Sequence, residues 1–553
     1  MTTPATPSST ATPDNPAGQP AVVLGCGPVG QTAALCLASW GVPVVMLDAR
    51  PERDPIGSKA LCQQRDVLDV WDHLGAGRQI AAEGVTWTRA VTLYQGRELF
   101  TQGFVDRGHS PFPPFVNIGQ NRTEELLDEK IHANPLISER WGRTVEAIEQ
   151  DDDSITLACR LADGSLERVT GAFCIAAPGN MGHLVRDMVG MSFEGTTFED
   201  QFLICDIRTT LPGWELERRF YFDPEWNPGR QVLIHPCPDS TYRIDWQVPP
   251  SYDLQAEQAS GALDARIRKI VGDADYEIIW HSVYRFHARQ VDRMVAGRLL
   301  MAGDGAHLVA PFGARGLNSG VPDAENAAWK VAFVMRGWAD PSLIDTYHDE
   351  RHAAATENLD VTAATMRFLV PQSDAERAQR LAILEAAGTD PEARAQVNSG
   401  RMAEPFWYVD SPLTTASETH PFHGRPPKGE DPVAAPGVIA PDVAVTLADG
   451  STARVRALAR QGVLVLVGAE LDSSAVADAV AGLRCPTTVL SLGEVDPDGT
   501  VAAAFGAAPD EAWIVRPDAH ISAVATSAAE AGTAAYRAVR ARVAASAASP
   551  AIA

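Results

Sequence analysis

The sequence predicts an α/β protein in which two parts of one parallel sheet are separated by an inserted antiparallel sheet. Three observations support this fold class. A short apolar strand runs into a glycine loop and a helix at residues 21–41, and a second strand, glycine loop and helix follow at 297–337. Between them, residues 196–290 alternate short β-rich runs with aromatic residues. After residue 437 a further series of strand and helix patterns predicts a separate, smaller domain.

The first glycine loop has the features of a dinucleotide-binding βαβ unit. Gly25-Cys26-Gly27-Pro28-Val29-Gly30 has G-x-G-x-x-G spacing, and Asp48 ends the next strand, eighteen residues after the last glycine. In such a unit the glycines bring a pyrophosphate close to a helix N-terminus, and the acid accepts hydrogen bonds from a ribose. A nicotinamide dinucleotide and FAD both suit this unit.

The second glycine loop favours FAD over a nicotinamide. An apolar run at 299–302 ends at Gly303-Asp304-Gly305, and a loop with Gly313 and Gly316 leads to a helix expected over 319–336, with Pro322 in its first turn. A carboxylate, close glycines and a helix N-terminus suit a polyol and a partly anionic ring. The stretch closely resembles the second flavin fingerprint of class A flavoprotein monooxygenases, the aromatic hydroxylases of the p-hydroxybenzoate hydroxylase fold.

The resemblance implies a Rossmann-like FAD-binding domain of the glutathione-reductase type, with FAD bound non-covalently by both glycine loops. It places Asp304 at the ribitol of FAD and the loop from Pro311 beside the flavin ring. The implied FAD-binding residues are Gly25, Gly27, Pro28, Val29, Gly30, Asp48, Ala49 and Arg50 in the first unit, and Gly303, Asp304, Pro311, Gly313, Gly316, Leu317 and Asn318 in the second.

Three further segments resemble the family less completely. Lys59 precedes Ala60 where the family has Arg-Ala near the flavin, and Gln120 matches a flavin-contacting glutamine; Lys59 and the nearby Arg122 are equally explained as surface charges. Val185 and Arg186 match the Val-Arg pair of the family's middle motif. Gly179-Asn180 replaces Asp-Gly, and His183 replaces a serine. Because that motif is associated with FAD and NAD(P)H, the nicotinamide is expected in a surface groove near Arg186, Lys59 and Arg122.

Candidate catalytic residues come from the inserted sheet and the second loop. Tyr284 aligns with an active-site tyrosine of the phenol hydroxylase branch, although a strand aromatic is more often a core residue. His287 is a candidate acid or base, as are His235 and His281, and each is alternatively a satisfied core or surface histidine. Pro311 is expected beside the flavin. No metal site is expected.

Domain boundaries follow from these patterns and from a Pro-rich stretch at 404–437. We expect a disordered tail at 1–20, an FAD-binding domain at 21–195 and 296–400, a substrate-binding sheet at 196–295, a linker at 401–436, and a C-terminal domain at 437–553. The last resembles the thioredoxin-like domain of the phenol hydroxylase and hydroxyphenylpropionate hydroxylase branch. It has no CxxC, so its expected role is stability or subunit contact, which leaves a homodimer open.

Composition limits the partners. The 553-residue chain has a formal net charge of −25, which argues against nucleic acid or an anionic membrane. No stretch has the pattern of a signal peptide or a membrane span, so a cytoplasmic protein is expected, with its eight cysteines reduced and mostly buried.

The resemblance implies an FAD-dependent monooxygenase that hydroxylates a phenolic or related aromatic substrate with NAD(P)H and O₂, through a flavin C4a-hydroperoxide. Two alternatives stay open. The altered middle motif would suit an FAD-dependent oxidoreductase of the same fold that does not carry out NAD(P)H-driven hydroxylation. A binding or assembly protein with structural FAD is the other.

Overall fold

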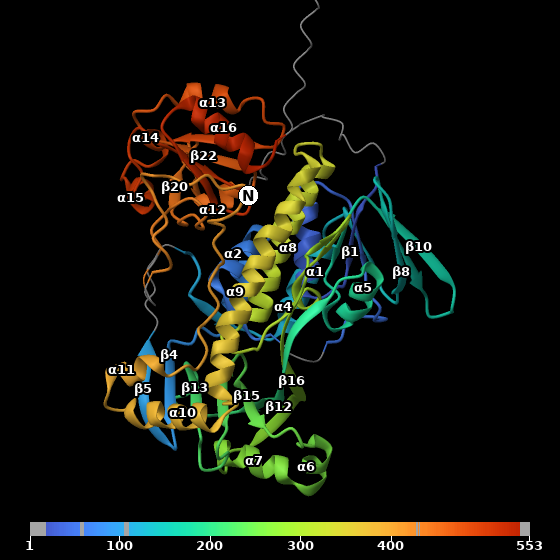
Figure 1. Ribbon diagram of the computed structural model, residues 1–553, viewed down its shortest axis with the longest axis vertical. Coiled ribbons are helices and arrows are strands. Elements are labelled where there is room, and N and C mark those ends of the chain that lie inside the picture. The colour runs from blue at the N-terminus through green and yellow to red at the C-terminus, as the bar shows by residue number, and fades with distance from the viewer. Residues whose placement is uncertain (1–17, 56–59, 104–109, 427–429, 431, 542–553) are drawn as a thin grey trace, which may run out of the picture.

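The computed structural model describes residues 18–55, 60–103, 110–426, 430 and 432–541, and Figure 1 shows their arrangement. At its centre is a six-stranded sheet in the order β17-β18-β11-β1-β2-β7. Its strands are β1 (Ala21–Leu24), β2 (Val44–Leu47), β7 (Ile137–Arg140), β11 (Cys174–Ala176), β17 (Val295–Ala296) and β18 (Leu299–Met301). All neighbours are parallel except β17 and β18. Because β11 pairs with both β1 and β18, the two glycine motifs lie two strands apart in one sheet, which confirms the predicted parallel core.

Two helices that follow the glycine loops, α1 (Pro28–Ser39) and α8 (Arg315–Met335), pack against each other over this sheet. The α8 helix differs from its prediction, because it begins at Arg315 and Pro322 lies inside it. Proline has no N–H to donate to the carbonyl of Asn318, four residues earlier, and the Asn318 side chain itself donates to the Ala314 oxygen at 2.6 Å. The helix N-terminus therefore starts within the glycine loop rather than after it.

Smaller elements complete the central domain. They are β3 (Cys62–Gln64), β6 (Phe115–Asn117), α2 (Arg65–His73), α3 (Gly77–Glu83), α4 (Gln120–His132), α5 (Gly182–Val189) and the 3₁₀ turns η1 (Gly179–Met181) and η2 (Gly303–Gly305). A separate three-stranded sheet contains β8 (Thr144–Gln150), β9 (Ile155–Arg160) and β10 (Leu166–Gly171). Its β9–β10 turn at Asp163-Gly164 confirms the predicted hairpin.

The inserted sheet has eight strands in the order β19-β16-β12-β15-β14-β13-β4-β5. They are β4 (Arg89–Tyr94), β5 (Arg97–Gly103), β12 (Phe193–Thr209), β13 (Glu217–Phe222), β14 (Gln231–Cys237), β15 (Thr241–Val248), β16 (Tyr276–Val291) and β19 (His307–Leu308). The prediction had placed residues 89–103 in the FAD-binding domain and made the sheet wholly antiparallel. Both points are wrong, because β4 and β5 join this sheet and β4 runs parallel to β13.

One face of the inserted sheet is covered by α6 (Leu254–Ser260) and α7 (Ala262–Val271). Leu203, Ile244 and Trp246 on that face form a buried cluster with Leu263 and Ile267 of α7. Because side chains alternate along a strand, the intervening residues face the central domain instead. The sheet thus presents a second face to the carboxyl ends of the parallel strands.

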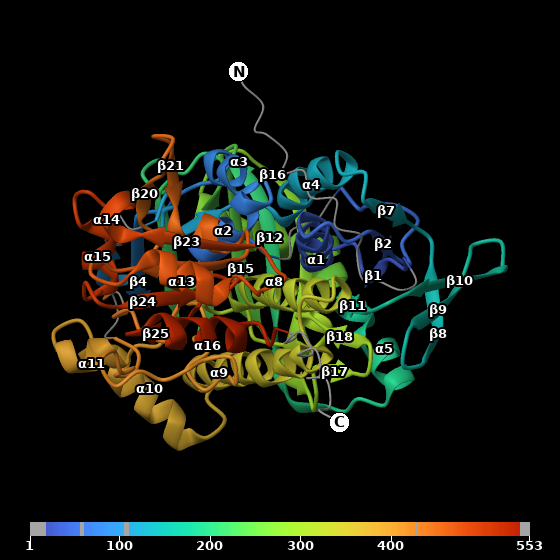
Figure 2. The same ribbon diagram turned by 90° about the horizontal axis from the view of Figure 1, so that it is seen from above.

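Further helices follow the second glycine motif. These are η3 (Pro341–Leu343), α9 (Asp345–Leu369), α10 (Asp374–Ala386) and α11 (Pro391–Gln396), with α9 alongside α8. The C-terminal domain contains a mixed four-stranded sheet in the order β23-β22-β24-β25. Its elements are β20 (Ala444–Thr446), β21 (Thr452–Arg454), α12 (Val455–Ala459), β22 (Val463–Val467), α13 (Ser473–Val480), β23 (Thr487–Ser491), α14 (Leu492–Val495), α15 (Thr500–Phe505), β24 (Ala512–Val515), β25 (Ile521–Ala525) and α16 (Ala528–Ala538). Figure 2 shows this domain and the β8–β10 sheet at opposite ends of the molecule.

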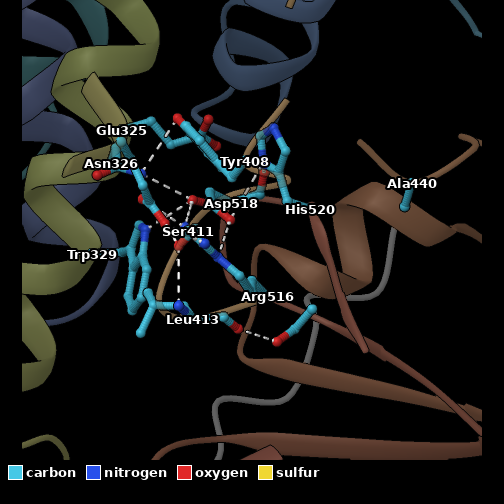
Figure 3. A network of polar contacts seen from close by, with 12 residues as sticks. Glu325, Asn326, Trp329, Tyr408, Ser411, Leu413, Ala440, Arg516, Asp518 and His520 are labelled. Atoms are coloured by element: carbon cyan, nitrogen blue, oxygen red, sulfur yellow. Dashed lines mark hydrogen bonds and ion pairs between the residues drawn. The ribbon is translucent and has the colours of Figure 1, made fainter. Parts of the chain in front are cut away.

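The stretch predicted as a linker is instead packed between the two bodies. Tyr408 is buried, and its hydroxyl accepts a hydrogen bond from Arg351 of α9 at 3.0 Å. Figure 3 shows the polar network at this junction. Asp518 of the C-terminal domain accepts from Asn326 at 3.1 Å and from Trp329 at 3.2 Å, both on α8. Interdomain contact therefore rests on buried hydrogen bonds as well as apolar packing.

All eight cysteines are unpaired, and seven are buried, which confirms the expectation of reduced thiols. In the part of the chain that the structure describes, no helix is long and apolar enough to cross a membrane.

Candidate active site

A cavity of about 760 Å³ joins the carboxyl ends of the parallel strands to the inserted sheet. Residues of both glycine motifs and of the sheet line it together. From the predicted FAD-binding set, the lining includes Gly25, Gly27, Pro28, Val29, Asp48, Ala49, Arg50, Gln120, Gly303, Asp304, Pro311, Gly313, Gly316 and Leu317. Carboxyl ends of parallel strands are where ligands bind in open α/β sheets. The structure therefore brings together most of the residues that the sequence singled out.

The three glycines of the first fingerprint differ in the space around them. A Cβ added at Gly25 would lie 2.2 Å from the Ala177 oxygen, and one at Gly30 would lie 1.8 Å from the Gly25 oxygen. These two positions are glycine because protein atoms occupy the space. A Cβ at Gly27 would meet no atom within 4 Å. Gly27 thus leaves open space at the N-terminus of α1, which fits the pyrophosphate of a dinucleotide.

Asp48 is an ionised hydrogen-bond acceptor in the cavity wall. Its carboxylate accepts from the Cys26 N–H at 2.8 Å and from the Arg50 N–H at 2.9 Å. Burial raises the pKa of Asp48, but the hydrogen bonds from Arg50 and Cys26 outweigh it and hold the pKa below its ordinary value. An ionised carboxylate at the end of β2 is suited to the ribose hydroxyls of an adenosine.

The turn that presents Asp304 is held by a residue that the sequence reading missed. Asp323 of α8 is fully buried and accepts from the Gly303 N–H at 3.0 Å, from Arg351 Nε at 2.7 Å and from His307 Nε2 at 2.7 Å. Burial raises the pKa of Asp323, yet Arg351 and His307 bring it below its ordinary value. The sequence does contain a signal for Asp323. It is a charged residue on the part of the helix that also carries Ala324 and Ala327, where an apolar core residue is expected.

The loop from Pro311 to Leu317 forms one wall of the cavity. A Cβ at Gly316 would meet no protein atom within 4 Å, whereas one at Gly313 would lie 2.0 Å from the Arg401 oxygen. Gly316 at the N-terminus of α8 therefore leaves room for a ligand, and Gly313 allows the 401 segment to approach. Asn318 is absent from the lining, because its amide binds the Gln64 N–H at 2.9 Å and the Cys62 oxygen at 2.8 Å.

Tyr284 and His287 lie on opposite faces of β16. Trp280, Ser282, Tyr284 and Phe286 all line the cavity. His287 is three residues beyond Tyr284 and therefore points the other way, where its Nδ1 lies 2.9 Å from Thr197 Oγ1. The structure thus places Tyr284 and Pro311 at the cavity and His287 on the other face of β16, so the geometry does not support a catalytic role for His287, which stays an untested prediction. His281 likewise pairs with Gln258 at 2.9 Å on the helix-covered side.

The predicted nicotinamide groove stays a prediction. Arg186 is buried and donates to the Gly305 oxygen at 2.7 Å, whereas Arg122 forms an exposed ion pair with Glu83 at 2.7 Å. Arg186 is therefore engaged inside the protein, and Arg122 lies at the surface. Lys59 lies outside the described residues. Gly179 and Asn180, the altered part of the middle motif, do line the cavity.

The inserted sheet also contributes charged side chains to the cavity, of which the sequence reading named only His235. Arg218 on β13, His235 on β14, and Arg243 and Asp245 on β15 all belong to its lining. Arg243 is paired with Asp206 at 2.7 Å. Arg218 is 6% exposed and makes no hydrogen bond or ion pair with any described residue; burial lowers its pKa to about 10. An unpaired buried cation facing a cavity suits an anionic or strongly polar ligand group.

A family model described as FAD binding domain matches residues 19–362. The chain belongs to this family, that of the class A FAD-dependent aromatic monooxygenases. FAD is its cofactor, and the open glycine positions and ionised Asp48 fit it. The family resemblance predicted from the sequence is confirmed.

Two similar curated proteins are named hydroxylating enzymes. The chain is 27% identical over 372 residues to pentachlorophenol 4-monooxygenase of Sphingobium chlorophenolicum, covering 65% of this chain and 67% of that protein. It is also 27% identical over 381 residues to 3-(3-hydroxy-phenyl)propionate/3-hydroxycinnamic acid hydroxylase 2 of Burkholderia vietnamiensis, covering 67% of this chain and 66% of that one. The matched region thus spans about two thirds of each relative.

The fold is that of known flavoprotein monooxygenases. The flavin-dependent monooxygenase PieE, solved with FAD and substrate, matches with a TM-score of 0.83 at 23% identity, over 94% of this chain and 99% of that one. This likeness extends through the C-terminal domain and supports the fold.

Proposed function

We propose that this protein is an FAD-dependent monooxygenase that hydroxylates a phenolic or related aromatic substrate with NAD(P)H and O₂. One observation carries the proposal. A single cavity is lined both by the two glycine motifs and by Trp280, Tyr284 and Phe286 of the inserted sheet. A cofactor held by the motifs would thus share its cavity with a wall suited to an aromatic ring.

The residues of the chain have distinct tasks in this proposal. Asp48 and Gly27 would hold the adenosine and pyrophosphate of FAD, and Asp304 its ribitol. The loop from Pro311 to Leu317 would lie along the flavin ring, where the positive end of α8 favours negative charge. The redox chemistry that links NAD(P)H to O₂ is supplied by FAD when it is bound.

The inserted sheet would bind and orient the substrate. Phe202, Phe286 and Phe312 form a cluster of rings, with centroids of Phe202 and Phe286 4.4 Å apart and stacked. This apolar wall would exclude water and position an aromatic ring, while Tyr284 beside it offers a hydroxyl.

The second candidate is an FAD-dependent oxidoreductase of the same fold without NAD(P)H-driven hydroxylation. It is favoured by Gly179-Asn180 in the cavity wall and by the internal hydrogen bond of Arg186 to the Gly305 oxygen. The test is stopped-flow reduction of the purified holoprotein by NADH or NADPH, with and without phenols, together with product mass. Strong acceleration by a phenol and an added oxygen atom support the monooxygenase. No reduction by either donor with a bound phenol supports the alternative.

For the C-terminal domain we propose a thioredoxin-like fold that serves stability or subunit contact. The mixed sheet with α13 and α16 packed on it supports the fold. Cys485 is buried and burial raises its thiol pKa to about 11, which is unsuited to disulfide exchange. A homodimer through this domain stays a prediction, which sedimentation of the purified protein would test.

A further inference from the structure

The polar side chains of the inserted sheet form a compact group on its cavity face. Asp245 is the cross-strand partner of Leu233 and Ile204, and both of these line the cavity, as does His235 two residues along β14. Arg218 reaches the same face from β13. Arg243, which is paired with Asp206, and Ser282 line the same face, and the rest of its lining is aromatic or aliphatic.

The spacing of His235 and Asp245 leaves a gap of defined size. His235 Nε2 lies 3.7 Å from Asp245 Oδ2, which is too long for a hydrogen bond. One oxygen atom that sits about 2.8 Å from each would bridge them. His235 Nδ1 and Asp245 Oδ1 are enclosed and have no partner among the described residues, so Nε2 and Oδ2 are the atoms turned to the cavity.

The chemistry of the pair selects a hydroxyl group. Nδ1 of His235 is enclosed and has no acceptor, so a proton on Nδ1 would be a buried N–H without a hydrogen bond. The tautomer with the ring proton on Nε2 avoids this cost. Burial, Arg218 and Arg243 all lower the pKa of His235, so the ring is neutral. The site then offers one donor and one carboxylate acceptor. A hydroxyl both accepts and donates, whereas a carboxylate or an ether cannot donate to Asp245.

We propose that His235, Asp245 and Arg218 form a substrate subsite that binds and ionises a phenolic hydroxyl, an inference that rests on the proposed monooxygenase function. The hydroxyl accepts from His235 and donates to Asp245. When the O–H bond breaks, the proton moves to the Asp245 carboxylate and the electron pair stays on the phenolate oxygen. The guanidinium of Arg218, which has no counterion of its own, stabilises that oxygen. The negative charge then activates the aromatic ring toward an electrophile.

The surroundings of Asp245 suit a proton acceptor near neutral pH. Burial raises its pKa to about 7, Asp206 on β12 adds to the rise, and Arg243 and Arg218 oppose it. His235 on β14 also faces it, and the thiol of Cys237, two residues further along β14, interacts with it electrostatically. A carboxylate of ordinary pKa would be a much weaker acceptor for a phenol, whose pKa is about 10.

The test compares 2-naphthol with its methyl ether, 2-methoxynaphthalene, on the FAD-loaded protein. Binding is followed by the perturbation of the flavin spectrum. We expect the wild type to bind the phenol at least about tenfold more tightly than the ether, because the ether leaves a buried carboxylate without its donor. In Asp245→Asn this ratio should fall to near one. Asp239→Asn, an exposed residue in the β14–β15 turn, is the matched control and should keep the wild-type ratio.

A second readout reports ionisation directly. At pH 8 the absorbance of bound 2-naphthol should be that of the naphtholate in the wild type and in Asp239→Asn, and that of the neutral phenol in Arg218→Met. Equal binding of phenol and ether by the wild type, failure to bind the phenol, or a neutral bound phenol would overturn the subsite. None of these results decides whether NAD(P)H reduces the flavin, so failure of the subsite is distinct from failure of the monooxygenase.

Discussion

At the residue scale, two of the Asp-Gly pairs of the chain allow a carboxylate at the cavity to be compared with one at an exposed turn. Asp304 lines the cavity, whereas Asp163 is an exposed hairpin residue that accepts from the Ser165 N–H at 2.9 Å. We expect Asp304→Ala to lower FAD affinity about ten- to a hundred-fold, the usual effect of losing a hydrogen bond to a charged group. Asp163→Ala should leave it unchanged. Equal flavin content after dialysis of both variants would show that the ribitol site is elsewhere.

The glycines of the first fingerprint give a second residue-scale prediction. In Gly27→Ala the new methyl meets no protein atom, so the apoprotein should fold as the wild type does while FAD binding weakens at least tenfold through a clash with the pyrophosphate. In Gly30→Ala the methyl would overlap the Gly25 oxygen, so thermal stability should fall even without FAD. Thermal midpoints of the apoproteins and FAD titrations distinguish the two. Equal apoprotein midpoints would contradict the assignment.

How far the sequence could predict the site depends on the kind of signal each residue carries. The glycines and Asp48 follow a local spacing rule, and Gly25, Gly27 and Asp48 line the cavity. The exclusion of His287 from the cavity face was also available, since a residue three positions from Tyr284 on a strand must face the other way. Arg218 and Asp245 could not be found in this manner. Their partners lie on neighbouring strands, and only the sheet order brings them to one face.

At the element scale, α8 links the cavity to the C-terminal domain through a buried charge network. Glu350 of α9 receives Lys330 Nζ at 2.6 Å and Arg516 Nη2 at 3.0 Å, and Arg516 also binds Asp518 at 2.6 Å. Arg516 is fully buried. We expect Arg516→Met to destabilise the protein by about 3–5 kcal/mol, because two carboxylates stay buried without their shared cation. Urea unfolding measures this, and Arg168→Met, an exposed pair with Glu149, should leave the midpoint unchanged.

The same network predicts a dependence on pH. Burial raises the pKa of Glu350, but Arg516 and Lys330 overcome it and bring the pKa to about 2. A carboxylate with a lowered pKa in the folded state stabilises the protein above its unfolded value of about 4.3 and loses that contribution as pH falls towards 2. The thermal midpoint of the wild type should therefore drop steeply between about pH 4.5 and 2. In Arg516→Met the drop should be shallower, and parallel curves for the two proteins would rule out this role for the network.

Element boundaries were harder to predict than element types. The early start of α8 at Arg315 was missed because Pro322 signalled a first turn, although the helix carries this proline in its interior. The strands β4 and β5 were missed because they reach the inserted sheet from another part of the chain, and sequence order does not reveal that pairing.

At the scale of the whole molecule, the C-terminal domain completes the core of the FAD-binding body. Trp329 and Phe333 of α8 and Leu343 pack in one cluster with Val465 and Ile514 of the C-terminal sheet. The stretch predicted as a linker is Pro-rich, but Trp407 and Tyr408 within it are buried, and Tyr408 contacts Arg351 of α9. Composition alone therefore could not distinguish a tether from a packed connector.

A chain ending at residue 436 tests this dependence. Truncation would expose the apolar face of α8 and leave Asn326 without Asp518, so we expect aggregation or a clearly lower thermal midpoint, together with lower flavin content. A chain ending at residue 541 keeps all of these contacts and should match the full-length protein. Size-exclusion chromatography and thermal unfolding measure both. A monomeric 436-residue chain with unchanged midpoint and flavin would mean that the C-terminal domain is an independent attachment, and that the buried network adds nothing to the stability of the catalytic body.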